Sequence, residues 1–84
     1  MGCSGMSRTL QSTRHQALRL FLIERRKKAG LTQAVVAERL GRYQSFVASV
    51  ESGQRRLDVV ELLQFAEAIG FDPREAIKRL QAVA

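Results

Sequence analysis

The chain contains 84 residues, with 14 Lys and Arg against 8 Asp and Glu and a formal net charge of +6. A chain of this length folds as one small domain and leaves no room for a large catalytic cavity. Its one Cys and one His, Cys3 and His15, are too few for an internal disulfide or for a tetrahedral zinc site of Cys and His ligands. We therefore expect no metal and no cofactor, a reduced thiol at Cys3, and a solvated or capping role for His15.

The charge is unevenly distributed along the chain. Residues 1–56 contain 11 basic and 3 acidic residues, whereas residues 57–84 contain 3 basic and 5 acidic ones. A basic front of this kind favours a polyanionic partner, either nucleic acid or an anionic membrane surface. The longest apolar run, residues 20–23, is far shorter than the roughly 18 residues that span a bilayer. Residues 1–10 have no apolar signal-peptide core, so we expect a cytoplasmic protein.

The first part of the chain predicts a flexible arm followed by a helix. Residues 1–13 are rich in Gly, Ser and Thr and have no apolar period, which is typical of a flexible arm. A helical pattern then runs over residues 14–29, with Leu18 and Phe21 on one face. Basic residues fill its last turn, where cations suit the helix dipole, and Gly30 is placed to end it.

Two short helices are predicted next, over residues 33–40 and 44–52. Thr32 is an N-cap candidate for the first of them, and only Gly41 and two further residues separate the pair. Helices that meet at a steep angle need a small residue on the first helix and a Gly in the turn. The spacing therefore predicts a helix-turn-helix, with an ordinary helical hairpin as the alternative. Its expected inward residues are Val36, Ala37, Leu40, Phe46, Val47 and Val50.

Two further helices complete the predicted fold. Asp58 and Glu61 have the spacing of a capping box for a helix that ends at Ile69, and Pro73 opens a last helix over residues 73–82. Their expected inward residues are Leu62, Leu63, Phe65, Ala66, Ile69, Ala76, Ile77, Leu80 and Val83. No segment alternates with period two, so we predict an all-α protein. It is a compact five-helix bundle that contains the helix-turn-helix, with its domain over residues 14–84.

The central part of the chain resembles the Cro/repressor-type, or Xre-like, helix-turn-helix family, which includes the phage lambda and 434 repressors. The resemblance extends over about residues 16–78. It implies sequence-specific binding of double-stranded DNA by a small transcriptional regulator, expected to be a repressor. A homodimer on a palindromic operator is expected, without a small-molecule substrate. The segments that carry the resemblance are Gly-Leu-Thr-Gln at 30–33, Val-Ala-Glu-Arg-Leu-Gly at 36–41, Gln-Ser at 44–45, Glu-Ser-Gly at 51–53 and residues 62–70.

By this resemblance, the helix over residues 44–52 is the recognition helix, and its N-terminal end enters the major groove. If Val47 and Val50 face inward, four positions face outward. Gln44 is the leading candidate because a Gln side chain can pair with adenine N6 and N7. For Ser49, a simply solvated residue is an equal alternative. The expected base-reading residues are Gln44, Ser45, Ala48 and Ser49.

The resemblance also implies contacts with the DNA backbone. In the family, the Gln at position 33 bonds a phosphate and braces the recognition helix, and amides at the helix start add an anion contact. Solvation alone is the alternative for the arginines. The expected backbone-contacting residues are Thr32, Gln33, Arg42, Tyr43, Arg55 and Arg56. Tyr43 replaces the usual Ser or Thr cap, and Phe46 replaces a small or polar residue, so it is expected to pack on the preceding helix or touch a DNA sugar.

Two further expectations follow from the resemblance. Arg26 and Glu51 occupy positions that form a structural ion pair in related repressors. Ile77, Leu80 and Val83, together with Leu20 or Ile23, are dimer-interface candidates, unless they only cover the core of the monomer.

Functions of other classes remain as alternatives or are disfavoured. The same fold serves antitoxins, so a toxin or another protein partner is the alternative to a plain regulator. An enzyme is not expected, because Glu24, Glu38 and His15 lie on separate helical faces and no Gly-rich phosphate loop is present. Binding to a membrane is not expected either, because the basic first helix should be packed against its neighbours.

Overall fold

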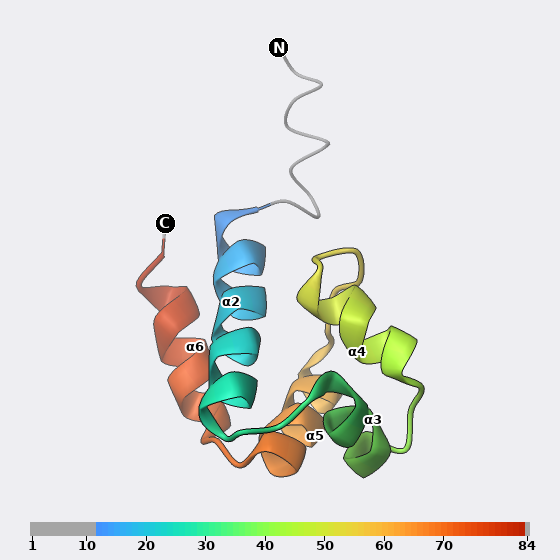
Figure 1. The fold of residues 1–84 in the computed structure, drawn as a ribbon. Coiled ribbons are helices and arrows are strands. Elements are labelled where there is room, and N and C mark those ends of the chain that lie inside the picture. Colours follow the sequence, from blue (N-terminus) through green and yellow to red (C-terminus); the bar gives the residue numbers. More distant parts are fainter. Residues whose placement is uncertain (1–11, 84) are drawn as a thin grey trace.

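The computed structural model describes residues 12–83 and contains, within that range, five helices and no strand. The predicted all-α fold is therefore confirmed. The helices are α2 (Thr13–Lys28), α3 (Gln33–Leu40), α4 (Gln44–Glu51), α5 (Val59–Ile69) and α6 (Pro73–Gln81). Helix α2 packs against α6 on one side and α4 on the other, and α5 closes the base of the bundle beside α3 (Figure 1). The predictions for residues 1–11, including Cys3, lie outside the described residues.

Side-chain caps fix where the helices begin. Helix α2 begins at Thr13, one residue earlier than predicted, because the Ser12 hydroxyl accepts a hydrogen bond from the backbone of the first turn. Thr32 caps α3 in the same way, and Asp58 forms the predicted capping box at α5. Asp72 caps α6 directly before its first-turn proline. These short-range hydrogen bonds satisfy amides that have no partner inside a helix.

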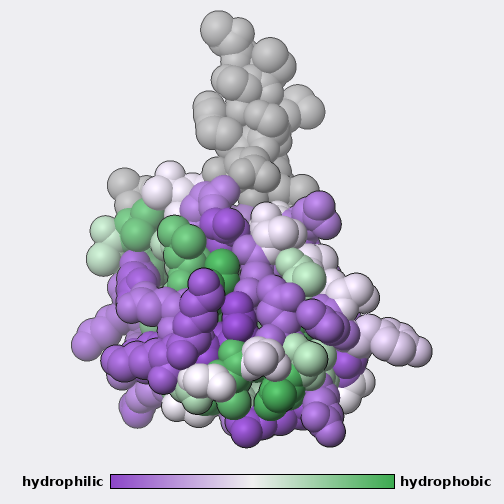
Figure 2. All heavy atoms as spheres, in the orientation of Figure 1, coloured by the Kyte–Doolittle hydropathy of each residue, from purple (hydrophilic) through white to green (hydrophobic). Residues whose placement is uncertain are grey.

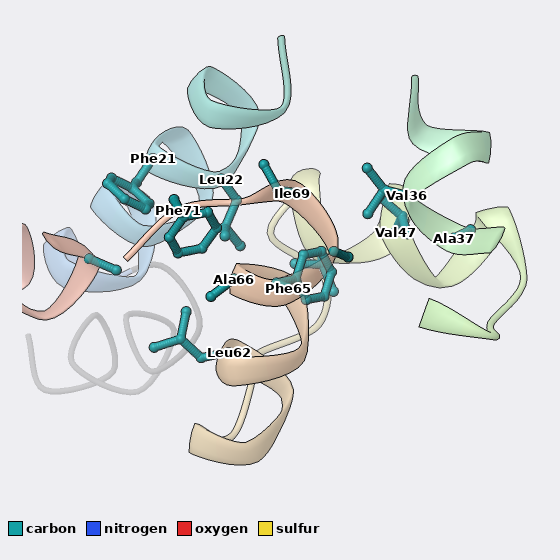
Figure 3. Packing of buried hydrophobic residues seen from close by; sticks show 13 residues of the cluster. Phe21, Leu22, Val36, Ala37, Val47, Leu62, Phe65, Ala66, Ile69 and Phe71 are labelled. Atoms are coloured by element: carbon teal, nitrogen blue, oxygen red, sulfur yellow. The ribbon is translucent and has the colours of Figure 1, made fainter. Parts of the chain in front are cut away.

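The hydrophobic core lies between all five helices (Figure 3). Phe21 of α2 meets the edge of Phe71, with ring centroids 5.0 Å apart and an interplanar angle of 85°, the arrangement that aromatic pairs favour. The predictions that Leu63 and Ile77 face inward are wrong, because these side chains are 45% and 44% exposed. Each follows a buried residue directly, and one step along a helix turns a side chain by about 100°. The buried apolar residues are Phe21, Leu22, Val36, Ala37, Val47, Val50, Leu62, Phe65, Ala66, Ala68, Ile69, Phe71 and Ala76.

Charged residues hold α6 against α2. Arg25 pairs with Glu75, and Arg79 Nη1 lies 3.4 Å from a carboxylate oxygen of Glu24. Both guanidinium groups also lie over the Phe21 ring, with their Cζ atoms 5.2 and 5.0 Å from its centroid. Charged side chains thus cover the outer rim of the core, and the face seen in Figure 2 is largely hydrophilic with smaller apolar patches. No helix within residues 12–83 is long and apolar enough to cross a membrane.

Candidate nucleic-acid interface

A tight turn joins α3 to α4. Gly41 has a left-handed φ of 70°, which an L residue with a side chain rarely adopts. The Arg42 amide donates to the Ala37 carbonyl at 2.9 Å and closes the last turn of α3. Val36 and Ala37 of α3 are buried together with Val47 of α4, so a packed apolar seam fixes the angle between the two helices. The predicted helix-turn-helix is confirmed.

The outer face of α4 is exposed at its N-terminal end. Gln44 and Ser45 are exposed, and Tyr43 just before them is 86% exposed and makes no side-chain cap. Ala48 and Ser49, which we expected to face outward, are only half-exposed. The Ser49 hydroxyl donates to the carbonyl of the residue three positions earlier at 2.7 Å, a common use of a serine inside a helix. The fully outward surface of α4 is therefore its first turn.

A buried ionic network fixes the inner side of α4. Arg26 of α2 donates to both carboxylate oxygens of Glu51, at 2.6 and 3.0 Å. The Gln33 amide adds a third hydrogen bond to the same carboxylate at 2.9 Å, and Arg26 also donates to the Leu31 carbonyl. The side chains of Arg26 and Glu51 are only 12% and 7% exposed. Helices α2, α3 and α4 thus meet at one bidentate ion pair.

The C-terminal end of α4 is held by the first turns of α2, which the sequence did not indicate. His15 is buried, and its Nε2 lies 3.1 Å from the Gly53 carbonyl. Because a carbonyl only accepts, Nε2 donates in this contact. Arg19 donates to the Glu51 carbonyl at 2.8 Å. These donors satisfy carbonyls at the C-terminal end of α4. The His15 side chain is therefore not solvated, and it caps the end of α4 and not the start of its own helix.

Two of the arginines expected on the DNA backbone are held close together. Arg42 and Arg55 place their Cζ atoms 3.7 and 4.8 Å from the ring centroid of Phe46. Arg55 donates to both carboxylate oxygens of Glu61, at 3.0 and 2.9 Å, and Arg42 Nη1 lies 3.9 Å from that carboxylate. Phe46 packs on Phe65 of α5, with ring centroids 6.0 Å apart. We call Arg42, Phe46, Arg55 and Glu61 the Phe46 cluster.

The ionic contacts of the Phe46 cluster shift its pKa values. The hydrogen bond from Arg55 is the main cause that lowers the pKa of Glu61 below its ordinary value of 4.5. The same hydrogen bond raises the pKa of Arg55. Both groups are therefore charged at neutral pH.

The remaining predicted residues lie around α4 and on α6. Thr32 and Gln33 open α3, while Arg56 follows Arg55 in the loop after α4 and is exposed. The Gln33 amide is already bonded to Glu51. On α6, the side chain of Ile77 is exposed and that of Leu80 is half-buried, and Val83, just after the helix, is half-buried as well.

Comparison with known proteins identifies relatives of this arrangement. The family model described as "Helix-turn-helix domain" matches residues 6–80. An XRE-family like protein from Pseudomonas syringae pv. tomato str. DC3000 is 45% identical, over 92% of this chain and 94% of that one, with a TM-score of 0.81. The restriction-modification controller protein C.AhdI from Aeromonas hydrophila is 35% identical, over 74% and 94% of the two chains, with a TM-score of 0.69.

A more distant structure shares the fold alone. The clp gene regulator ClgR from C. glutamicum is 19% identical, over 82% of this chain and 90% of that one, with a TM-score of 0.74. No curated protein matches the chain at a significant level. The family model nevertheless spans most of the chain, and the more similar solved structures cover it at high identity. The chain therefore belongs to the Cro/repressor-type, or Xre-like, helix-turn-helix family of DNA-binding regulators.

Proposed function

We propose that the protein is a homodimeric transcriptional repressor that binds a palindromic operator in double-stranded DNA. The observation that carries this proposal is the first turn of α4. It exposes Gln44 and Ser45 on a helix that is held on its inner side and at its end. Base-reading side chains must be held within a few tenths of an ångström of their targets. The cytoplasm would be its site of action.

Base readout centres on the exposed turn in this proposal. Gln44 is the residue best suited to pair with an adenine, and Ser45 can donate or accept at several bases. Ala48 and Ser49 lie deeper in α4 and are half-exposed. Ala48 offers a methyl group to a thymine, and Ser49 reaches DNA only when its hydroxyl leaves the helix backbone.

Backbone binding involves residues on three sides of α4. Thr32 and Gln33 present the start of α3, Arg42 and Tyr43 precede α4, and Arg55 and Arg56 follow it. Arginine and backbone amides bind phosphates irrespective of base sequence. The positive charges of Arg42, Arg55 and Arg56 on both sides of this short helix support the assignment.

The dimer is proposed to form through exposed apolar side chains. Ile77 of α6 and Leu20 of α2 are 44% and 53% exposed, and Leu80 and Val83 extend the α6 surface as half-buried neighbours. Helix α5 carries a second exposed apolar strip, which is formed by Val59, Val60 and Leu63. Two variants, Ile77→Glu and Val60→Glu, decide between these two surfaces. Sedimentation equilibrium measures the dimerisation of each variant, and the substitution that abolishes the dimer identifies the interface.

Selection of bound sequences from a random duplex library tests the proposed function. We expect an inverted repeat whose half-sites are about 10 base pairs apart. Gln44→Ala should lose about 1–3 kcal/mol of discrimination at one base pair per half-site, whereas the control Gln81→Ala, an exposed glutamine of α6, should select the wild-type site. Salt-sensitive binding to every sequence, without enrichment, would refute sequence-specific recognition.

A further inference from the structure

Two arginines of the Phe46 cluster share a single carboxylate, that of Glu61. Arg42 lies before α4 and Arg55 lies after it, yet both guanidinium groups lie over one ring and near the carboxylate of Glu61. The side chains of Arg42 and Arg55 are 42% and 41% exposed, whereas that of Glu61 is 13% exposed. The two cations face solvent, and the one anion that orients them is largely covered.

The contacts of Arg55 leave one edge of its guanidinium group available. Arg55 Nη1 donates to Glu61 and to the Arg56 carbonyl, and Nη2 donates to the second Glu61 oxygen. Of the five N–H groups of an arginine, the one on Nε and one on Nη2 have no protein acceptor among residues 12–83. These two lie on the same edge and form a fork that fits two oxygens of a phosphate.

We propose that Glu61 is a positioning residue for DNA binding, which holds Arg55, and with it Arg42, on the Phe46 ring in an orientation ready for backbone phosphates. This inference rests on the proposed function. A free arginine loses rotamer freedom when it binds a phosphate, whereas an arginine that is already held does not lose it again. Glu61 acts through the arginines and does not itself touch DNA.

Replacement of Glu61 changes the affinity for DNA in opposite directions under the two explanations, positioning of the arginines and general electrostatic attraction. Glu61→Gln removes a negative charge, so general electrostatic attraction to DNA would rise. Positioning predicts the opposite, because a neutral amide no longer holds the guanidinium of Arg55. The Gln oxygen can still accept the hydrogen bond from the Asp58 amide, and Gln is accepted at this position of a capping box, so the start of α5 is preserved.

The test measures affinity for a mixed-sequence 20-base-pair duplex by fluorescence anisotropy between 50 and 300 mM KCl. Glu61→Gln is expected to bind about fivefold more weakly at 0.15 M salt and to lower the salt slope by about 0.9, which is the effect of one lost phosphate contact. The matched control is Glu67→Gln, the same charge change at an exposed position of the same helix. We expect that control to bind as tightly as the unmodified protein or more tightly.

A second variant keeps the test informative if Glu61→Gln does not fold. Arg55→Lys retains the charge but lacks the planar fork, so positioning predicts weaker binding and a lower slope, whereas charge alone predicts no change. Arg74→Lys on α6 is its control. Binding of Glu61→Gln that equals or exceeds that of Glu67→Gln would overturn the positioning role and leave the proposed function intact. Failure of the unmodified protein to bind either this duplex or any sequence in the random library would instead overturn the proposed function.

Discussion

Substitution of Glu51 by Leu should remove a large share of the folding stability. The substitution leaves the guanidinium of Arg26, whose side chain is 12% exposed, without its counter-ion. It removes three hydrogen bonds to the carboxylate, of which two come from Arg26 and one from Gln33. Loss of one partner of a buried ion pair costs about 3–5 kcal/mol. Domains are stable by only about 5–15 kcal/mol, and Tm should fall by about 12 °C or more in a domain of this size.

Urea denaturation followed by circular dichroism at 222 nm measures this loss. The exposed pair of Arg25 and Glu75 provides the control, because Glu75→Leu should cost less than about 1 kcal/mol. The double variant Arg26→Met with Glu51→Leu replaces both charges by apolar groups and should recover most of the loss. A loss below about 1 kcal/mol for Glu51→Leu would show that water reaches the pair. A double variant that is less stable than Glu51→Leu alone would show that Arg26 is not left as an unpaired buried charge in the single variant.

Three further predictions concern contacts around α4, at Gly53, His15 and Glu61. Gly53→Ala should destabilise the fold by about 1–2 kcal/mol, and by more than Gly41→Ala. Both have positive φ, but a Cβ at Gly53 would lie 3.3 Å from Arg19 Cδ, whereas nothing lies within 4 Å at Gly41; equal thermal midpoints would contradict this difference. His15→Ala should cost about 1–3 kcal/mol in chemical denaturation, because a buried carbonyl loses its donor, and an unchanged midpoint would mean that His15 is solvated. Because the pKa of Glu61 is lowered in the fold, its contribution to stability is present above pH 4.5 and is lost as the pH falls through 4.5 and the lowered value. Glu61→Gln should therefore flatten the fall in urea midpoint between pH 6 and pH 3, and parallel curves would contradict the shift.

The helix boundaries were predictable because their signals are local. Thr32, Asp58 and Pro73 each act within one turn of the helix they begin, and the observed ends lie within one residue of the predicted ones. The two residues Leu62 and Leu63 illustrate the limit of a periodic pattern. Both are apolar and adjacent, and only the position of neighbouring helices decides which of them is buried.

The site was predictable only where the family resemblance indicates residues. The contact of His15 with Gly53 joins positions 38 residues apart, and nothing in the local sequence distinguishes it from a solvated histidine. The Phe46 cluster likewise depends on Arg42, Arg55 and α5 meeting in space. Sequence spacing cannot show that an arginine expected on a phosphate first pairs with a carboxylate.

Different residues of α4 determine its folding and its proposed recognition of DNA. The helix has 8 residues, too few to be stable alone in water, and its orientation is fixed by buried contacts at Glu51 and at its C-terminal carbonyls. Tyr43, Gln44 and Ser45 lie outside those contacts, and substitutions at exposed positions of this kind usually change stability by less than about 0.5 kcal/mol. On the proposed function, related chains can therefore acquire new operator preferences by drift at the first turn of α4 while the same scaffold is inherited unchanged.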